Sequence, residues 1–214
     1  MFLTQQLPRL GAIAALAAFL LIGATGALAQ GTPEAATPAS ASIEAAIMTA
    51  DGTMVGKVEV VQNEDGVTFT VLLDAGALPE GEHGMHVHET GTCSQGGDSA
   101  FALANAHYNP TDQHHGAPNS DSSHAGDLGN LLAASDGSAD FTITVTTVSL
   151  DPSAADTLLD ADGSALIIHA DADDLKTDPS GNSGDRVLCA VLSPNMTATP
   201  VASPAAMPMG TPAG

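Results

Sequence analysis

Six histidines and one aspartate stand at spacings that suit two adjoining metal sites. These residues are His86, His88, His107, His115, His124, Asp127 and His169. Of the eight histidines in the chain, only His83 and His114 lie outside this set. Imidazole nitrogens are ligands of zinc and copper, and a mixed set of histidines and one carboxylate suits tetrahedral zinc. The types and spacing of these residues therefore predict a site that binds transition metals.

The candidate ligands fall into groups with informative spacing. His86 and His88 are separated by one residue, so on a β-strand both side chains point from the same face. Alone, this pair is as typical of a polar edge strand as of a metal site. His115, His124 and Asp127 follow at intervals of nine and three residues. Several glycines stand beside them, which favours a loop shaped around an ion over a polar loop with chance histidines.

Short apolar runs separated by turn residues predict that β-strands position these side chains. Hairpin turns are expected at the Asp-Gly pairs 51–52 and 65–66. The pattern predicts an all-β domain of about eight strands. The runs are residues 43–48, 56–62, 67–73, 139–150, 164–169 and 186–192.

Two long stretches interrupt the strands, residues 89–127 and 171–185. Both are rich in Gly, Asn, Asp and Ser and show little hydrophobic periodicity. Loops of that length are usually functional or disordered. Because candidate ligands lie at the edges of both stretches, we expect two functional loops ordered by metal ligation.

The first 29 residues have the composition of a secretory signal peptide. They carry one charge, at Arg9, and a long apolar run that ends in the small-residue cleavage site preceding Gln30. The apolar run is longer than is usual for such signals, so an uncleaved membrane anchor is the alternative.

The regions on either side of the predicted domain are of low complexity. Pro, Ala, Thr and Ser dominate residues 30–42 and 194–214, and such segments cannot bury a core. We interpret them as a linker and a C-terminal tail. The remaining residues, 43–193, have a length that suits one domain with a sizeable core.

Two cysteines, Cys93 and Cys189, lie 96 residues apart in a chain for which we predict export from the cytoplasm. In an oxidising compartment such a pair predicts a disulfide. Two free buried thiols, or soft metal ligands, are the alternative.

The chain is strongly acidic, with a formal net charge of −21. Removal of residues 1–29 makes this charge one unit more negative, because Arg9 is lost. An acidic surface disfavours nucleic acid and anionic membranes as partners. It favours solubility and a monomeric or weakly associating particle, although the sequence leaves the oligomeric state open.

The strings GMHVHE, NAHYNP, HHGAP, HAGDLGN, HADADD and GDRVLCAVL occur in this order along the chain. Together they resemble the copper/zinc superoxide dismutase family over residues 43–193. The resemblance implies an eight-stranded antiparallel Greek-key sandwich or barrel with two long functional loops.

The resemblance also implies a ligand set for each metal, with one copper and one zinc per subunit. Copper would be bound by His86, His88, His107 and His169, and zinc by His107, His115, His124 and Asp127. His107 would bridge the two ions as an imidazolate, a form that two cations favour. Asp173 would accept hydrogen bonds from His86 and His115 and orient them. A solvated loop acid is the alternative for Asp173.

The implied reaction is the disproportionation of superoxide to O2 and H2O2 by a copper redox cycle. His107 would act as a catalytic residue that gains and loses a proton. Arg186 matches the catalytic arginine that binds the superoxide anion beside copper, unless it pairs with the neighbouring Asp185. Lys176 is the other nearby cation that could attract an anion.

Four features depart from many members of the family. The insertion lies between Cys93 and His107, a layout typical of bacterial secreted members. The second loop is short, with Pro179 where many eukaryotic relatives carry a lysine, and Ala190 stands where glycine is common. The strong acidity is the fourth departure. Electrostatic attraction of an anion is then weaker than in those relatives, or depends on Lys176.

The main alternative is a non-enzymatic copper-delivery or structural domain of the same fold. A metal-buffering role for the acidic, histidine-rich loops is another. In each case the export signal predicts a periplasmic, secreted or cell-envelope location. The N-terminal segment is then a candidate envelope tether.

Overall fold

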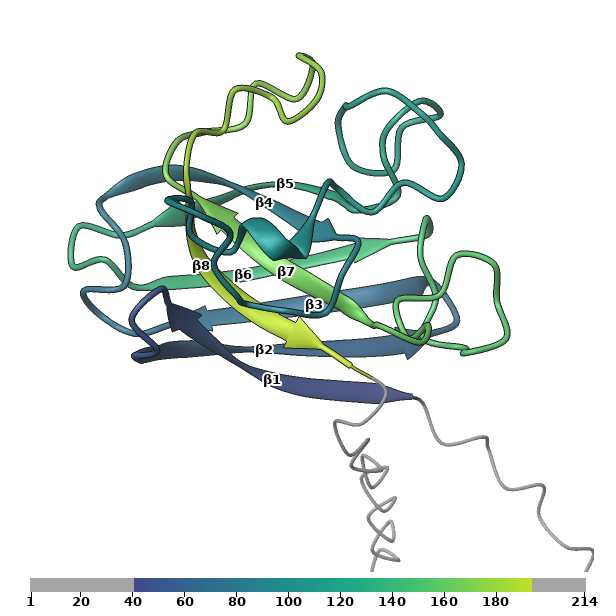
Figure 1. Ribbon diagram of the computed structural model, residues 1–214, viewed down its shortest axis with the longest axis horizontal. Helices are drawn as coiled ribbons and strands as arrows, with labels where there is room; N and C mark the ends of the chain where they lie inside the picture. The colour runs from purple at the N-terminus through teal and green to yellow at the C-terminus, as the bar shows by residue number, and fades with distance from the viewer. Residues whose placement is uncertain (1–40, 194–214) are drawn as a thin grey trace, which may run out of the picture. The chain divides into compact units, whose positions relative to one another are not determined.

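The computed structural model describes residues 41–193, which form eight strands and one short 3-10 helix (Figure 1). The predicted signal, the tail and most of the linker lie outside the described residues. Within 41–193 no helix is long and apolar enough to span a membrane. The elements are β1 (Ser42–Thr49), β2 (Met54–Asn63), β3 (Gly66–Leu73), β4 (Gly81–His88), η1 (Ala102–Ala104), β5 (Asp127–Ala133), β6 (Ala139–Val145), β7 (Ser164–His169) and β8 (Arg186–Leu192).

The strands form one antiparallel sheet in the order β5-β4-β7-β8-β1-β2-β3-β6. The two end strands, β5 and β6, also contact each other, so the sheet nearly closes into a barrel. Strands distant in sequence pair at β4–β7, β8–β1 and β3–β6, which is the Greek-key type of connection. The predicted eight-stranded antiparallel Greek-key barrel is confirmed.

Alternating side chains explain how the strands build the core. In β3, Val67, Phe69, Val71 and Leu73 are buried, whereas the residues between them are partly or fully exposed. This period of two places one face of the strand on the barrel interior. β7 differs because all six of its residues are buried. It therefore lies between the barrel interior and the loop that covers its outer face.

The strand boundaries differ modestly from those predicted. β1 extends one residue beyond the expected run at each end, and β6 ends at Val145 rather than at residue 150. After Val145 the chain leaves the sheet, and Thr146 and Thr147 form hydrogen bonds with Asn119 and Ala125 of the long first loop. The sequence pattern does not single out β5, because its DLGNLLA segment begins inside the predicted first loop.

Both long loops leave the barrel on the same side (Figure 1). The first loop, residues 89–126, is joined to β8 by a disulfide between Cys93 and Cys189. The predicted disulfide is therefore confirmed over the free-thiol alternative. A small apolar cluster beneath this loop contains Phe101, Ala104, Ala165, Ile167 and Cys189. The second loop, residues 170–185, connects β7 to β8.

Candidate metal centre

Neighbouring strands bring the candidate ligands together where the two loops begin. β4 carries His86 and His88, and the paired strand β7 ends at His169. β5 begins at Asp127, which pairs with His86. His107 forms an isolated bridge with His88, so it joins the same face from the first loop.

Four buried imidazole nitrogens have no hydrogen-bond partner among the described residues. They are His86 Nδ1, His88 Nε2, His107 Nε2 and His169 Nε2. One ligand atom from each of these histidines lies within 4.8 Å of those of the other three. A buried nitrogen without a partner costs about 1–3 kcal/mol. A metal ion would supply that partner, so this first cluster fits a cation that prefers imidazole ligands.

The opposite ring nitrogens of this cluster are held by hydrogen bonds. His88 Nδ1 donates to the carbonyl oxygen of Asn105 at 2.8 Å, and His169 Nδ1 to that of Gly184 at 3.1 Å. His86 Nε2 donates to Asp173 Oδ2 at 2.8 Å. These bonds fix the orientation of each ring and leave the unpaired nitrogen directed at the cluster.

A second cluster surrounds Asp127. The Nδ1 atoms of His107, His115 and His124 lie 3.0, 3.1 and 3.4 Å from Asp127 Oδ1. Asp127 Oδ2 accepts hydrogen bonds from the backbone N–H groups of Gly116 and His124, each at 3.0 Å. Three imidazoles and one carboxylate form a donor set that suits tetrahedral zinc.

Around Asp127, the group of ligand atoms that all lie within 4.8 Å of one another contains His86 rather than His124. We favour His124, because His86 Nε2 is already bonded to Asp173 and His86 Nδ1 belongs to the first cluster. His107 contributes to both clusters, with Nε2 in the first and Nδ1 in the second.

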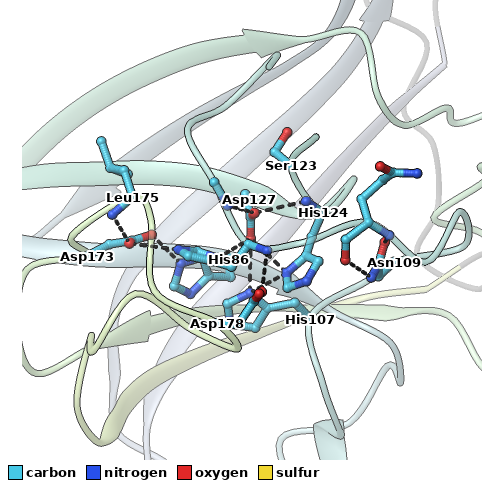
Figure 2. Close-up of polar contacts among 12 residues, drawn as sticks. His86, His107, Asn109, Ser123, His124, Asp127, Asp173, Leu175 and Asp178 are labelled. Atoms are coloured by element: carbon cyan, nitrogen blue, oxygen red, sulfur yellow. Dashed lines mark hydrogen bonds and ion pairs between the residues drawn. The ribbon is translucent and has the colours of Figure 1, made fainter. Parts of the chain in front are cut away.

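Asp173 joins the two clusters from the second loop (Figure 2). Its Oδ2 accepts from His86 Nε2, and its Oδ1 accepts from His115 Nε2, both at 2.8 Å. Asp173 is buried rather than solvated. The side chain of Asn130 in β5 bonds to the backbone N–H and C=O of Asp173. Each cluster is thus oriented by the same carboxylate.

Burial lowers the pKa values of the histidines of the first cluster, whereas hydrogen bonds with two carboxylates raise the pKa of His115 in the second. Burial lowers the pKa of His107 to about 4 and that of His169 to about 3. Burial opposes a raised pKa for His115, yet its hydrogen bonds with Asp127 and Asp173 outweigh it and raise the pKa to about 10. The pKa values of both carboxyl groups are lowered despite burial, by hydrogen bonds from the histidines.

Arg186 lies beside the first cluster in a cavity of about 560 Å³, which is also lined by His88, His107 and His169. Its guanidinium donates to the carbonyl oxygens of Phe101 at 2.8 Å and Asn105 at 2.6 Å. Within residues 41–193 these bonds take the place of the ion pair with Asp185 that the sequence left open. Lys176 is exposed and does not line this cavity.

Several residues at the site carry no distinctive sequence signal. His83 is buried, with its ring nitrogens 2.8 and 3.0 Å from the carbonyl oxygens of His169 and Pro79. Asp178 contacts His114 and the backbone of His115. Its position in an acidic, irregular segment could not reveal this, because the partner lies in the other loop.

A Greek-key barrel with two adjoining histidine clusters defines the class: a β-barrel protein whose clustered side chains could hold metal ions. The family model for copper/zinc superoxide dismutase matches residues 54–192. The chain belongs to this family.

Relatives of known name support that membership. The chain is 39% identical to superoxide dismutase [Cu-Zn] of Caulobacter vibrioides over 153 residues, which cover 71% of this chain and 85% of that protein. It is 38% identical to superoxide dismutase-like protein YojM of Bacillus subtilis over 146 residues, or 68% and 72% of the two chains.

Solved structures share the fold. A SOD-like protein from Bacillus subtilis, crystallised as a variant with a tyrosine and a proline replaced by histidine, has a TM-score of 0.65 at 36% identity. That match covers 72% of this chain and 99% of the other. Cu/Zn superoxide dismutase from Brucella abortus has a TM-score of 0.57 at 25% identity, with coverage of 71% and 99%.

Proposed function

We propose that this protein disproportionates superoxide to O2 and H2O2 at a copper and zinc centre. The main support for this proposal is the first cluster. Its four buried imidazole nitrogens have no hydrogen-bond partner among the described residues, and the cluster lies beside a cavity lined by Arg186. Family membership supports the same reaction.

The donor chemistry supports one assignment of the two metals. In it, His86, His88, His107 and His169 hold copper, whereas His107, His115, His124 and Asp127 hold zinc. Bound copper supplies a one-electron couple that accepts an electron from one superoxide and returns an electron to a second. Zinc has no redox chemistry, so its role is to hold His107 and shape the site.

The residues around the cavity have distinct tasks in the proposed reaction. Arg186 binds and orients the anion, because its guanidinium is the single cationic group among the described residues that line the cavity. His107 would be a ligand of both metals, and its Nε2, which faces the first cluster without a partner among the described residues, would take up and release a proton. Two protons are consumed for each H2O2, so this nitrogen and water together supply them.

We also propose that the protein acts outside the cytoplasm. The disulfide and the bacterial relatives support an oxidising location such as the periplasm. N-terminal sequencing of the exported protein tests the cleaved signal. Recovery of intact residues 1–29 in the membrane fraction would favour the anchor, and with it an envelope tether.

Copper delivery or metal buffering is the second candidate. The observation that favours it is the similarity to a relative that is named only superoxide dismutase-like. Delivery or buffering predicts metal binding without turnover, and buffering predicts several weakly bound ions.

The decisive experiment measures superoxide disproportionation and metal content together. The recombinant chain from Gln30 onward, loaded with copper and zinc, is compared with its His169→Ala variant. We expect high turnover with about one copper and one zinc per chain, and loss of copper and activity in the variant. Full metal loading without turnover would reject the enzyme in favour of the second candidate.

A further inference from the structure

Asp178 joins the two long loops through a contact that the proposed reaction does not use. Its Oδ1 accepts a hydrogen bond from the backbone N–H of His115 at 2.6 Å, and its Oδ2 accepts from His114 Nδ1 at 2.7 Å (Figure 2). Within residues 41–193, the bond to His115 is the one hydrogen bond from the second loop to the backbone of the first.

This contact involves His115, whose ring must be positioned accurately if it is to bind the metal of the second cluster. Asp173 holds His115 Nε2 at 2.8 Å, and His115 Nδ1 lies 3.1 Å from Asp127 Oδ1. Asp173 acts on the ring of His115, whereas Asp127 also accepts a hydrogen bond from the backbone N–H of the next residue, Gly116. Asp178 adds a further point of attachment, at the backbone N–H of His115 itself. With the backbone and both ring nitrogens held, His115 has little freedom to move away from the second cluster.

Hydrogen bonds within the second loop stabilise the segment that carries Asp178. Asp174 accepts hydrogen bonds from the backbone N–H groups of Lys176 and Thr177, and from the side chains of Thr177 and Asn182. The backbone N–H of Gly181 donates to the carbonyl of Thr177 at 2.7 Å. The backbone segment that carries Asp178 is therefore held in place by hydrogen bonds within its own loop.

We propose that Asp178 is a positioning residue for the second metal site, acting through the backbone of His115. The proposal rests on the proposed function for the identity of the metal, zinc.

The two hydrogen bonds that Asp178 accepts differ in strength. The pair with His114 is open to water, since 84% of the His114 side chain and 49% of the Asp178 side chain are exposed. Exposed ion pairs contribute little to stability. The bond to the His115 N–H is charge-assisted, and His115 itself is buried, which makes the bond the stronger of the two. Loss of Asp178 should therefore matter more than loss of His114.

Zinc affinity, measured by competition with a chelator at fixed pH, tests the proposal. We expect Asp178→Ala to weaken zinc binding about tenfold, at the low end for residues that orient metal ligands. Asp178→Asn keeps an oxygen that can accept from His115 N–H, so it should restore most of the affinity. His114→Ala should bind zinc as the wild type does.

Asp121→Ala is the matched control. It removes the same charge from the exposed part of the first loop near His124, and within residues 41–193 its carboxylate has no hydrogen bond. A control that loses as much zinc affinity as Asp178→Ala would show a general charge effect and overturn the proposal. Unchanged zinc affinity in Asp178→Ala would also overturn it.

A replacement variant and a measurement on the wild type complete the test. If Asp178→Ala fails to fold, Asp178→Glu replaces it, because this variant keeps the charge and displaces the carboxylate by one methylene group. Weaker zinc binding supports the positioning role, whereas unchanged binding refutes it. Wild-type protein that binds zinc without turnover defeats the proposed reaction alone, while failure of the wild type to bind zinc defeats both proposals.

Discussion

The carbonyl oxygen of Asn105 connects Arg186, the proposed anion-binding residue, to His88, a proposed metal ligand. It accepts hydrogen bonds from Arg186 Nη2 at 2.6 Å and from His88 Nδ1 at 2.8 Å. Asn105 has φ 65° and ψ −148°, a conformation that is strained for any residue except glycine. Its side chain donates to Thr90 Oγ1, which helps to hold this geometry. The position of the guanidinium is therefore set by the backbone of the first loop.

Two substitutions of Arg186 distinguish the effect of its charge on the reaction from the effect of its planar geometry. Arg186→Gln should lower kcat/KM for superoxide by about 10- to 100-fold, because a charge-assisted hydrogen bond contributes about 1.5–3 kcal/mol. Arg186→Lys should fall between this variant and the wild type, since one ammonium cannot reproduce the planar fork to two carbonyls. Lys176→Gln is the control and should leave kcat/KM within about twofold, as Lys176 does not line the cavity. An equal loss in the control would contradict a specific role for Arg186.

The opposed pKa shifts predict different proton release for the two metals. In the metal-free protein at pH 7 to 9, His115 carries a second proton because its pKa is raised to about 10. Zinc must displace that proton from Nδ1, so zinc binding should release about one proton and strengthen about tenfold per pH unit in this range. His107 and His169, with pKa values of about 4 and 3, are already neutral.

Isothermal titration of the metal-free protein with zinc, in buffers of different ionisation enthalpy, measures this release. A value near zero would show that His115 is neutral before the metal binds. Titration with copper under the same conditions serves as the comparison, and His107 and His169 should contribute no proton to it.

At the scale of the elements, the second loop can orient the ligands because it packs closely on β4. A Cβ atom at Gly84 would lie 2.8 Å from Ser183 Cβ and 3.1 Å from Asp173 Cβ. The backbone N–H of Gly84 also donates to the carbonyl of Asp171 at 2.9 Å. Glycine at this position lets the loop reach the strand that carries His86.

Gly84→Ala should therefore displace the loop and weaken both metal sites through Asp173. We expect a loss of about 1–3 kcal/mol in the free energy of unfolding, as for other overpacked positions. Gly97→Ala is the control, because Gly97 has φ +65° and a Cβ atom there would meet no atom of a non-adjacent residue within 4 Å. It should cost backbone strain alone and leave zinc affinity unchanged. Wild-type zinc affinity in Gly84→Ala would show that the loop tolerates the added methyl group.

The sequence predicts the elements better than the contacts between them. Alternating apolar residues predict strands such as β3, and the Asp-Gly pairs predict the hairpins of β1, β2 and β3, because both signals are local. The pairing of β4 with β7 has no local signal. Asp178 and Asn105 escaped prediction for the same reason, since their partners lie 63 and 81 residues away in the chain.

For the whole molecule, the distribution of charge opposes the approach of an anion. The full chain has a formal net charge of −21, whereas Arg186 is the single cation among the described residues that line the cavity. Glu89 and Asp112 line the same cavity. Attraction by Arg186 acts at short range, while repulsion by the remaining acids acts over longer distances.

Salt should therefore accelerate this enzyme. The Debye length is about 30 Å at 0.01 M ionic strength and about 8 Å at 0.15 M, so added salt screens the distant acids more than it screens Arg186 at contact distance. We expect kcat/KM for superoxide to rise between these two concentrations. Asp112→Asn should raise the rate at low salt and reduce its salt dependence, whereas Asp65→Asn, in the turn between β2 and β3, should change both less. A rate that falls with salt would mean that the field of Arg186 extends beyond the cavity and outweighs the acidic surface.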